Sequence, residues 1–257
     1  MKVLIHAHTT FSNDGDLPPQ QLADIAARRG FDAALVTDHF ESMTRDSFCE
    51  LVQQCRGIAT CWMIPGYERS WDGYHMLALG VSEWYDDPDL ATWAQRVRAA
   101  GGLVVLAHPV RYGHSIPRPI LNECDAVEVW NSKFAYDGSI GPDPKAYELL
   151  GKERFPLCGQ DFHGVRHLTS VAVEVRETCA SVRSLMLCLR TGKYRMVNDL
   201  FSYGLRPPRF APILTAVHRI RRRMVKAAIR IRRTAVSYAL WRPHPRPKDQ
   251  TDSPGWN

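Results

Sequence analysis

Histidine and acidic side chains recur along this sequence in short groups whose residue types are those of metal-binding chemistry. The groups are His6 with His8, Asp38 with His39, Glu68 with His75, His108, and Asp161 with His163. Imidazole nitrogens and carboxylate oxygens are common ligands of zinc, manganese and iron in proteins. The residue types therefore predict a centre for divalent cations, provided that the fold brings the groups together.

The spacing of His6-Ala7-His8 supports this prediction. Side chains alternate between the two faces of a strand, so both rings are expected on one side, where they could chelate a single ion. Each group taken alone also has an ordinary structural explanation. Two histidines can lie on a strand face, Asp38 can cap a helix, and His108 before Pro109 can form a turn. The prediction therefore depends on the whole set of groups.

Short aliphatic runs alternate with amphipathic helical patterns, and these elements must position the groups. We expect strands at Val3–Ile5, Ala33–Val36, Trp62–Ile64, Met76–Leu79, Leu103–Leu106, Ala126–Val129, Pro156–Cys158 and Val171–Val175, and helices at Pro18–Arg29, Thr44–Gly57, Asp89–Ala100, Pro142–Leu150 and Ala180–Arg190. Several runs are apolar throughout, as buried parallel strands are. Strand and helix alternate about seven times, which favours an α/β barrel over an open sheet, although periodicity alone does not decide whether the sheet closes.

The candidate ligands fall at the ends of these expected strands. His6 and His8 follow the first strand, Asp38 and His39 the second, Glu68 the third, His108 the fifth, and Asp161 and His163 the seventh, while His75 opens the fourth. In β/α folds the carboxyl ends of the strands converge on one face, so we expect a single pocket. His114, His167, His218 and His244 lack this placement, and we interpret them as surface or loop histidines.

An ordered set of motifs resembles the PHP (polymerase and histidinol phosphatase) domain family over roughly residues 1 to 175. The motifs are His6-Ala7-His8-Thr9, Ser12-Asn13-Asp14-Gly15, Thr37-Asp38-His39, Pro65-Gly66-Tyr67-Glu68, His75, Ala107-His108-Pro109 and Gly159-Gln160-Asp161-Phe162-His163. The resemblance implies a distorted seven-stranded β/α barrel that hydrolyses phosphate esters. It identifies a superfamily and not a substrate.

The resemblance also implies two or three divalent metal ions, either manganese, zinc or iron. In that arrangement the first ion is held by His6, His8, Glu68 and Asp161, a second by Glu68, His75 and His108, and a third by Asp14, His39 and His163. Some family members have histidine at position 14, so occupancy of the third site is the least certain part of this expectation. Glu128 is expected to support or orient a ligand from behind.

The chemistry expected of such a centre is attack by a metal-bridging hydroxide on phosphorus. Protonation of the leaving oxygen would fall to Asp38, Asp161 or His163, between which the sequence does not choose. Arg111, Lys133 and Arg166 follow the fifth, sixth and seventh expected strands and are candidates for binding phosphate. For each of them an ordinary solvated loop charge is an equally good explanation.

The bulk composition indicates a globular protein. At 257 residues and 45% hydrophobic content, the chain can form one large catalytic domain, or a smaller domain with an appendage. A secretory signal pattern is missing, and no apolar run reaches the roughly 18 residues of a membrane-spanning helix, so we expect a cytoplasmic protein. Seven cysteines without a CxxC pair indicate reduced thiols.

The charge is distributed unevenly. Residues 206–248 carry thirteen Arg or Lys and no Asp or Glu, whereas the first 205 residues carry 20 basic and 25 acidic side chains. We therefore divide the chain into a domain at 1–205 and a basic amphipathic helix with a Pro-rich tail at 206–257. The apolar stripe between residues 213 and 241 could pack on the domain or mediate self-association. An anionic membrane surface is a second interpretation, and nucleic acid fits less well.

The sequence thus predicts hydrolysis of a small phosphomonoester or phosphodiester. Two alternatives remain, namely an exonuclease acting on nucleic acid ends, with the basic tail as a tether, and a metal-binding scaffold module without turnover. The complete set of candidate ligands argues against the scaffold. The choice between a small substrate and a nucleic acid requires an assay.

Overall fold

The computed structural model describes residues 1–133, residues 141–207 and seven single positions between 213 and 227. Most of the predicted basic helix and tail, including most of the stretch proposed for self-association at 213–241, therefore lies outside the described residues. Among the described residues, no helix combines the length and the apolar character that crossing a bilayer requires.

The described strands form two six-stranded sheets. The order in the first is β12 (Ser202–Tyr203), β11 (Tyr194–Val197), β10 (Ala172–Val175), β1 (Lys2–Ala7), β2 (Ala33–Val36) and β4 (Trp62–Ile64). The order in the second is β3 (Asp38–His39), β5 (Gly66–Trp71), β6 (Tyr74–Leu79), β7 (Leu103–Leu106), β8 (Ala126–Asn131) and β9 (Phe155–Gly159). Each of the eight expected strands overlaps an observed one. The expectation of a mixed α/β fold is confirmed.

The two sheets meet through short connections near the candidate ligands. Ala7 of β1 forms a parallel bridge with Phe162, and the His8 N–H donates to the carbonyl of Phe162 at 2.7 Å. On the other side, β2 of the first sheet continues after Thr37 directly into β3 of the second. Hydrogen bonding among the described strands therefore gives two joined sheets, where the sequence analysis expected one ring of seven strands.

Antiparallel strands account for this difference. A β5–β6 hairpin turns at Asp72-Gly73, and β10, β11 and β12 pair in antiparallel order beside β1. A strict alternation of strand and helix predicts parallel neighbours only, so neither feature was expected. The hairpin has a consequence for the site, since it places the start of β6 at the same end as the carboxyl end of β7.

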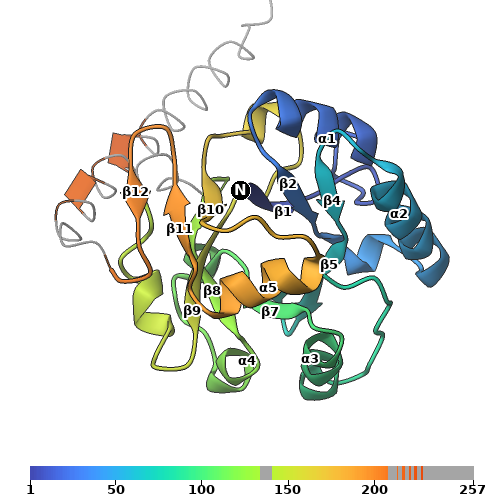
Figure 1. Cartoon of the computed structure of the whole chain (residues 1–257). Coiled ribbons are helices and arrows are strands. Elements are labelled where there is room, and N and C mark those ends of the chain that lie inside the picture. The colour runs from blue at the N-terminus through green and yellow to red at the C-terminus, as the bar shows by residue number, and fades with distance from the viewer. Residues whose placement is uncertain are drawn as a thin grey trace, which may run out of the picture.

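Helices cover the outside of the sheets. α1 (Pro19–Arg28) and α2 (Arg45–Gly57) lie beside β2 and β4, and α3 (Leu90–Ala99) packs against β7 (Figure 1). α2 begins with a capping box between Thr44 and Ser47, and the Asp89 carboxylate caps α3 by accepting from the Thr92 N–H at 2.8 Å. α4 (Arg118–Asn122) is short, and α5 (Val182–Arg190) follows β10.

One expected helix is wrong. Only the 3₁₀ turn η3 (Ala146–Leu149) forms where the pattern predicted a helix over Pro142–Leu150. Pro144 lacks an N–H and disfavours helical geometry at the residue before it, so the first half of that stretch does not join the helix. The core itself is apolar, and all four residues of β2 and of β7 are fully buried.

Candidate metal centre

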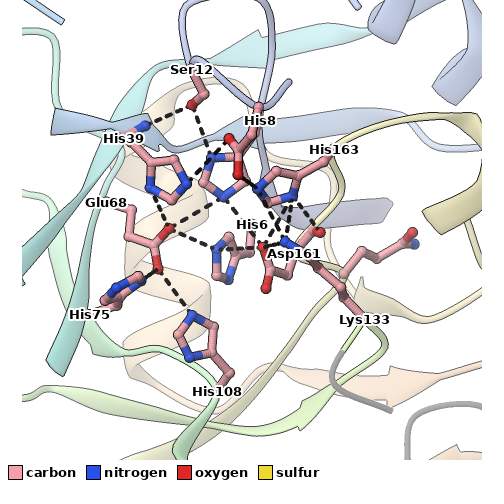
Figure 2. Close-up of polar contacts among 12 residues, drawn as sticks. His6, His8, Ser12, His39, Glu68, His75, His108, Lys133, Asp161 and His163 are labelled. Atoms are coloured by element: carbon pink, nitrogen blue, oxygen red, sulfur yellow. Dashed lines mark hydrogen bonds and ion pairs between the residues drawn. The ribbon is translucent and has the colours of Figure 1, made fainter. Parts of the chain in front are cut away.

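All nine residues proposed as metal ligands converge in one cluster. Figure 2 labels every one of them except Asp14. They form four overlapping groups whose ligand atoms lie within 4.8 Å of one another, namely His6 with His8 and Glu68; His6 with His108 and Asp161; Glu68 with His75 and His108; and His8 with Asp14, His39 and His163. The first three groups are almost entirely buried, and the last reaches the surface at Asp14.

Glu68, at 1% exposure, is the centre of the cluster. Its Oε1 lies 2.7 Å from His75 Nδ1 and 3.1 Å from His108 Nε2. Its Oε2 faces His39 Nδ1 at 3.1 Å, His8 Nε2 at 3.3 Å and His6 Nε2 at 3.5 Å. Burial by itself would raise the pKa of Glu68, but the charge of His6 and the close contacts of His108 and His39 outweigh it and hold the pKa well below its usual range.

Three buried ligand atoms have no hydrogen-bond partner, namely His6 Nε2, His8 Nε2 and Glu68 Oε2. They face one another, and Asp161 Oδ1 lies 3.6 Å and 3.5 Å from the two imidazole nitrogens. An unsatisfied buried polar group costs about 1–3 kcal/mol, so three together in a native core call for a partner. A divalent cation fits this set, because two imidazoles and two carboxylates would satisfy it from all sides.

His6 is held from behind by Glu128. The Nδ1 of His6 lies 2.8 Å from Glu128 Oε1, and since a carboxylate only accepts, Nδ1 carries a proton and Nε2 is the ring nitrogen that faces the cluster. Glu128 Oε2 accepts from the His108 N–H and from Asn131 Nδ2, each at 2.8 Å. These contacts favour the supporting role expected of Glu128.

Backbone strain is concentrated at the ligands. His6, His108 and Asp161 have φ angles of 66°, 30° and 49°, a region that residues other than glycine rarely adopt. At His6 the pairing of β1 with β2 shifts register, so a bulge aims this ring into the cluster beside His8, 5.2 Å away between ring centroids. Such strain costs on the order of 1–3 kcal/mol per residue and is typical of functional sites.

The most open group contains Asp14, which lies in the turn after β1 and is 51% exposed. Its two oxygens face His39 Nε2 at 3.4 Å and His163 Nε2 at 3.0 Å. The three residues implied for a third metal ion therefore lie together, with the aspartate as the ligand nearest to solvent.

Two of the three proposed phosphate-binding cations reach the cluster. Lys133 Nζ lies 3.2 Å from Asp161 Oδ1 and 3.0 Å from His163 Nδ1, and Arg111 Nη1 lies 3.3 Å from His75 Nε2. Arg166 is exposed on the turn Val165–His167 and makes no hydrogen bond or ion pair with the described residues of the cluster. The structure thus gives no support to a role for Arg166.

Asp38 occupies a different position from that of a proton donor. It is fully buried, and its carboxylate accepts from the N–H and hydroxyl of Thr9 and from the N–H and hydroxyl of Ser12. Burial raises the pKa of Asp38, and these hydrogen bonds oppose the rise. With both oxygens engaged by donors, Asp38 is poorly placed to protonate a leaving group, which leaves Asp161 and His163 as the candidates.

Sequence reasoning gave no role to Ser12, Asn131 or Gly159, which contact the ligand shell from behind. A Cβ on Gly159 would lie 1.8 Å from Glu128 Oε1 and 3.0 Å from His6 Cβ, so only glycine allows β9 to approach this pair. Small polar residues and glycines in loops carry no pattern that separates this role from an ordinary turn. His114, interpreted as a loop residue, pairs with Asp143 at 2.6 Å outside the cluster.

In sequence, no protein-family model matches this chain, and no curated protein matches it. In structure, it is similar to a two-domain protein from Bacteroides vulgatus containing a predicted PHP-like metal-dependent phosphoesterase, with a TM-score of 0.63 and 19% identity. The similarity covers 79% of this chain and 66% of that one, just under two thirds of its length. A protein from Bifidobacterium adolescentis named as a metal-dependent phosphoesterase matches with a TM-score of 0.44 and 17% identity, over 63% of this chain and 87% of that one.

Proposed function

We propose that this chain, which shares the fold of a PHP-like metal-dependent phosphoesterase, hydrolyses a small phosphomonoester or phosphodiester with two or three divalent cations. The observation that carries the proposal is the contact of one buried carboxylate, Glu68, with five imidazoles. Among these five, His6 and His8 have an unsatisfied ring nitrogen, and His6 and His108 have a strained backbone. A structural role alone gives no reason to bury so many ionisable groups together.

The residues that would hold the cations follow from the groups of neighbouring ligand atoms. His6, His8, Glu68 and Asp161 would hold one, Glu68, His75 and His108 a second, and Asp14, His39 and His163 a third. Bound cations would supply an activated water and neutralise the charge that develops on the phosphoryl oxygens. The contacts between β1 and Phe162 and the continuity of β2 with β3 support the further proposal that the sheets form a distorted barrel.

The side chains beside the ligands would bind the phosphate and supply a proton. Lys133 and Arg111 present cationic donors at two points on the edge of the cluster, suited to the oxygens of a phosphoryl group. Asp161 and His163 lie 3.3 Å apart at the Lys133 side, and we assign the proton for the leaving oxygen to one of them. Both residues also belong to the proposed ligand sets, so the proton donor would serve the metal as well as the substrate.

The test is a substrate panel with the full chain. The protein is stripped of metal, reloaded with manganese, zinc or iron, and assayed on nucleotides, sugar phosphates, histidinol phosphate, small phosphodiesters and labelled oligonucleotides. We expect turnover of a small phosphate ester that is lost in His8→Ala and Asp161→Asn, both of which should retain the fold. Cleavage of oligonucleotides alone would favour the exonuclease, and inactivity on every substrate with every metal would leave only a scaffold.

A further inference from the structure

The hydroxyl of Ser12 connects Asp38 to two candidate ligands. Its Oγ lies 2.8 Å from the backbone nitrogen of His39 and 3.1 Å from His8 Nδ1 (Figure 2). The same oxygen lies 2.8 Å from Asp38 Oδ1. Ser12 is 3% exposed, and Asp38 and His8 are fully buried, so water does not compete for these contacts. The direction in which Ser12 donates its single hydroxyl proton therefore determines which of its neighbours must donate to it.

Asp38 determines where that proton lies. Its Oδ1 also accepts the N–H groups of Thr9 at 2.6 Å and Ser12 at 3.0 Å, and its Oδ2 accepts the Thr9 hydroxyl at 2.7 Å. An oxygen that already accepts two backbone N–H groups acts as an acceptor toward its third neighbour. The Ser12 hydroxyl therefore donates to Asp38, and its lone pairs are left to accept.

The acceptor side of Ser12 then fixes His8. One lone pair accepts the N–H of His39, and the other faces His8 Nδ1. Because the hydroxyl proton is already used, His8 must carry its own proton on Nδ1 for this contact to be a hydrogen bond. The His8 Nε2 lone pair is then directed at Glu68 Oε2, 3.3 Å away, and at Asp161 Oδ1, 3.5 Å away.

We propose that Ser12 and Asp38 are positioning residues that fix the ring tautomer of His8 and the backbone of His39 for cation binding. The proposal rests on the proposed function and adds a role to two residues that touch neither a cation nor the substrate. His6 has the corresponding support directly from the carboxylate of Glu128, whereas His8 has it from Asp38 through a hydroxyl. Loss of such a partner typically weakens metal binding about 10- to 100-fold.

The first measurement is the tautomer of His8 in the full chain without metal. Nitrogen chemical shifts of ¹⁵N-histidine distinguish protonation at Nδ1 from protonation at Nε2, and the signals of His8 are identified by their loss in His8→Gln. We expect the Nδ1–H form in the wild-type chain, a mixture in Ser12→Ala, and the wild-type form in Ser12→Thr, which keeps the hydroxyl.

The second measurement is the affinity for zinc alone, obtained by competition with a chelator. We expect Ser12→Ala to bind about 10- to 100-fold more weakly and Ser12→Thr to recover most of the loss. The matched control is Ser47→Ala, which removes a serine hydroxyl from the capping box of α2. It should change neither the His8 signals nor the affinity for zinc.

The outcomes separate this proposal from the proposed function. Wild-type affinity and an unchanged tautomer in Ser12→Ala would overturn it even in an active phosphoesterase. An Nε2–H form of His8 in the wild-type chain would overturn it without any variant, so the test survives a failure of Ser12→Ala to fold. Absence of phosphoesterase activity with the expected tautomer and affinity would instead reject the function and leave the positioning role.

Discussion

At the scale of single residues, the ionisable side chains make the stability of the metal-free chain depend on pH in two opposed ways. Burial lowers the pKa of His8 to about 3 from 6.5, so the contribution of His8 to the stability of the folded chain is lost as the pH falls below 6.5. Burial also acts against His6, but the charges of Glu128, Asp161 and Glu68 raise its pKa well above 6.5, so its contribution is lost as the pH rises above that value. The depressed pKa values of Glu68 and Asp161 add a further loss under more acidic conditions.

We therefore expect the metal-free chain to be most stable near pH 6.5 and less stable on both sides. Urea unfolding with a chelator present, from about pH 4 to about pH 9, measures this directly. His6→Gln should flatten the alkaline limb. A stability that rises steadily across the whole range would contradict the assignment of opposite shifts to His6 and His8.

Lys133 and Arg166 provide a second prediction at this scale, because the sequence treated them alike and the structure separates them. Lys133→Gln should lower kcat/KM by about 10- to 100-fold, the equivalent of the ~1.5–3 kcal/mol of a hydrogen bond to a charged group. Arg166→Gln is the matched control and should change kcat/KM less than about twofold, since that side chain is exposed and outside the cluster. Equal losses of kcat/KM in both variants would show that the positive charge near the site, and not the contact of Lys133 with the cluster, supports catalysis.

The convergence of the candidate ligands could be predicted because their chemistry is visible in their residue types, and because strand ends bring remote positions together. The roles of Asp38 and Ser12 could not be predicted in this way. Asp38 stands next to His39 at a strand end, as a catalytic acid would, and only the four hydrogen bonds to its carboxylate distinguish it from one. A residue type limits the possible chemistry, and the partners decide which of these possibilities the fold uses.

At the scale of elements, the approach of β9 to β8 depends on Gly159. Gly159→Ala places a methyl group 1.8 Å from Glu128 Oε1, so the carboxylate that orients His6 has to move. We expect a loss of about 1–3 kcal/mol in the free energy of unfolding and about 10- to 100-fold in zinc affinity. Thermal or urea unfolding and chelator competition measure the two effects.

The control for this variant is Gly57→Ala at the end of α2, where an added Cβ meets nothing within 4 Å. Alanine favours helix over glycine, so this change should be neutral or stabilising by up to about 1 kcal/mol. If Gly159→Ala were as harmless as Gly57→Ala, Glu128 would be free to shift and could not be what orients His6.

Elements with a single clear period were predicted well, and elements with a mixed character were not. The bounds of β2, β4 and β7 agree with the expected strands, because each is a short apolar run. β5 was missed, since Glu68, Arg69 and Ser70 make Gly66–Trp71 look like a polar loop after a strand. Glu68 belongs to the site, so a residue required for function interrupts the strand pattern there.

At the scale of the whole molecule, strand alternation indicated the fold class and left the pairing of the strands open. The β5–β6 hairpin reverses one strand, and this reversal brings His75 to the carboxyl end of β7 beside His108, with 5.1 Å between the ring centroids. A parallel β6 would have placed His75 at the far end of the sheet. The site therefore depends on an antiparallel connection that local periodicity does not encode.

The uneven charge of the chain leads to the last prediction, which concerns residues after 205. Thirteen basic side chains and no acidic one lie between 206 and 248, and the described apolar side chains Ile213, Ile220 and Met224 are 66%, 58% and 67% exposed. Exposed apolar groups within a basic segment suit an anionic bilayer, whereas a second copy of the same segment would bring like charges together.

We expect the full chain to float with vesicles containing anionic phospholipid and not with neutral ones, and a chain ending at residue 205 to float with neither. Because each basic residue contributes on the order of 1 kcal/mol near an anionic surface, added salt should release the full chain. Equal behaviour of the two chains would end the membrane interpretation, and concentration-dependent dimerisation without flotation would favour self-association.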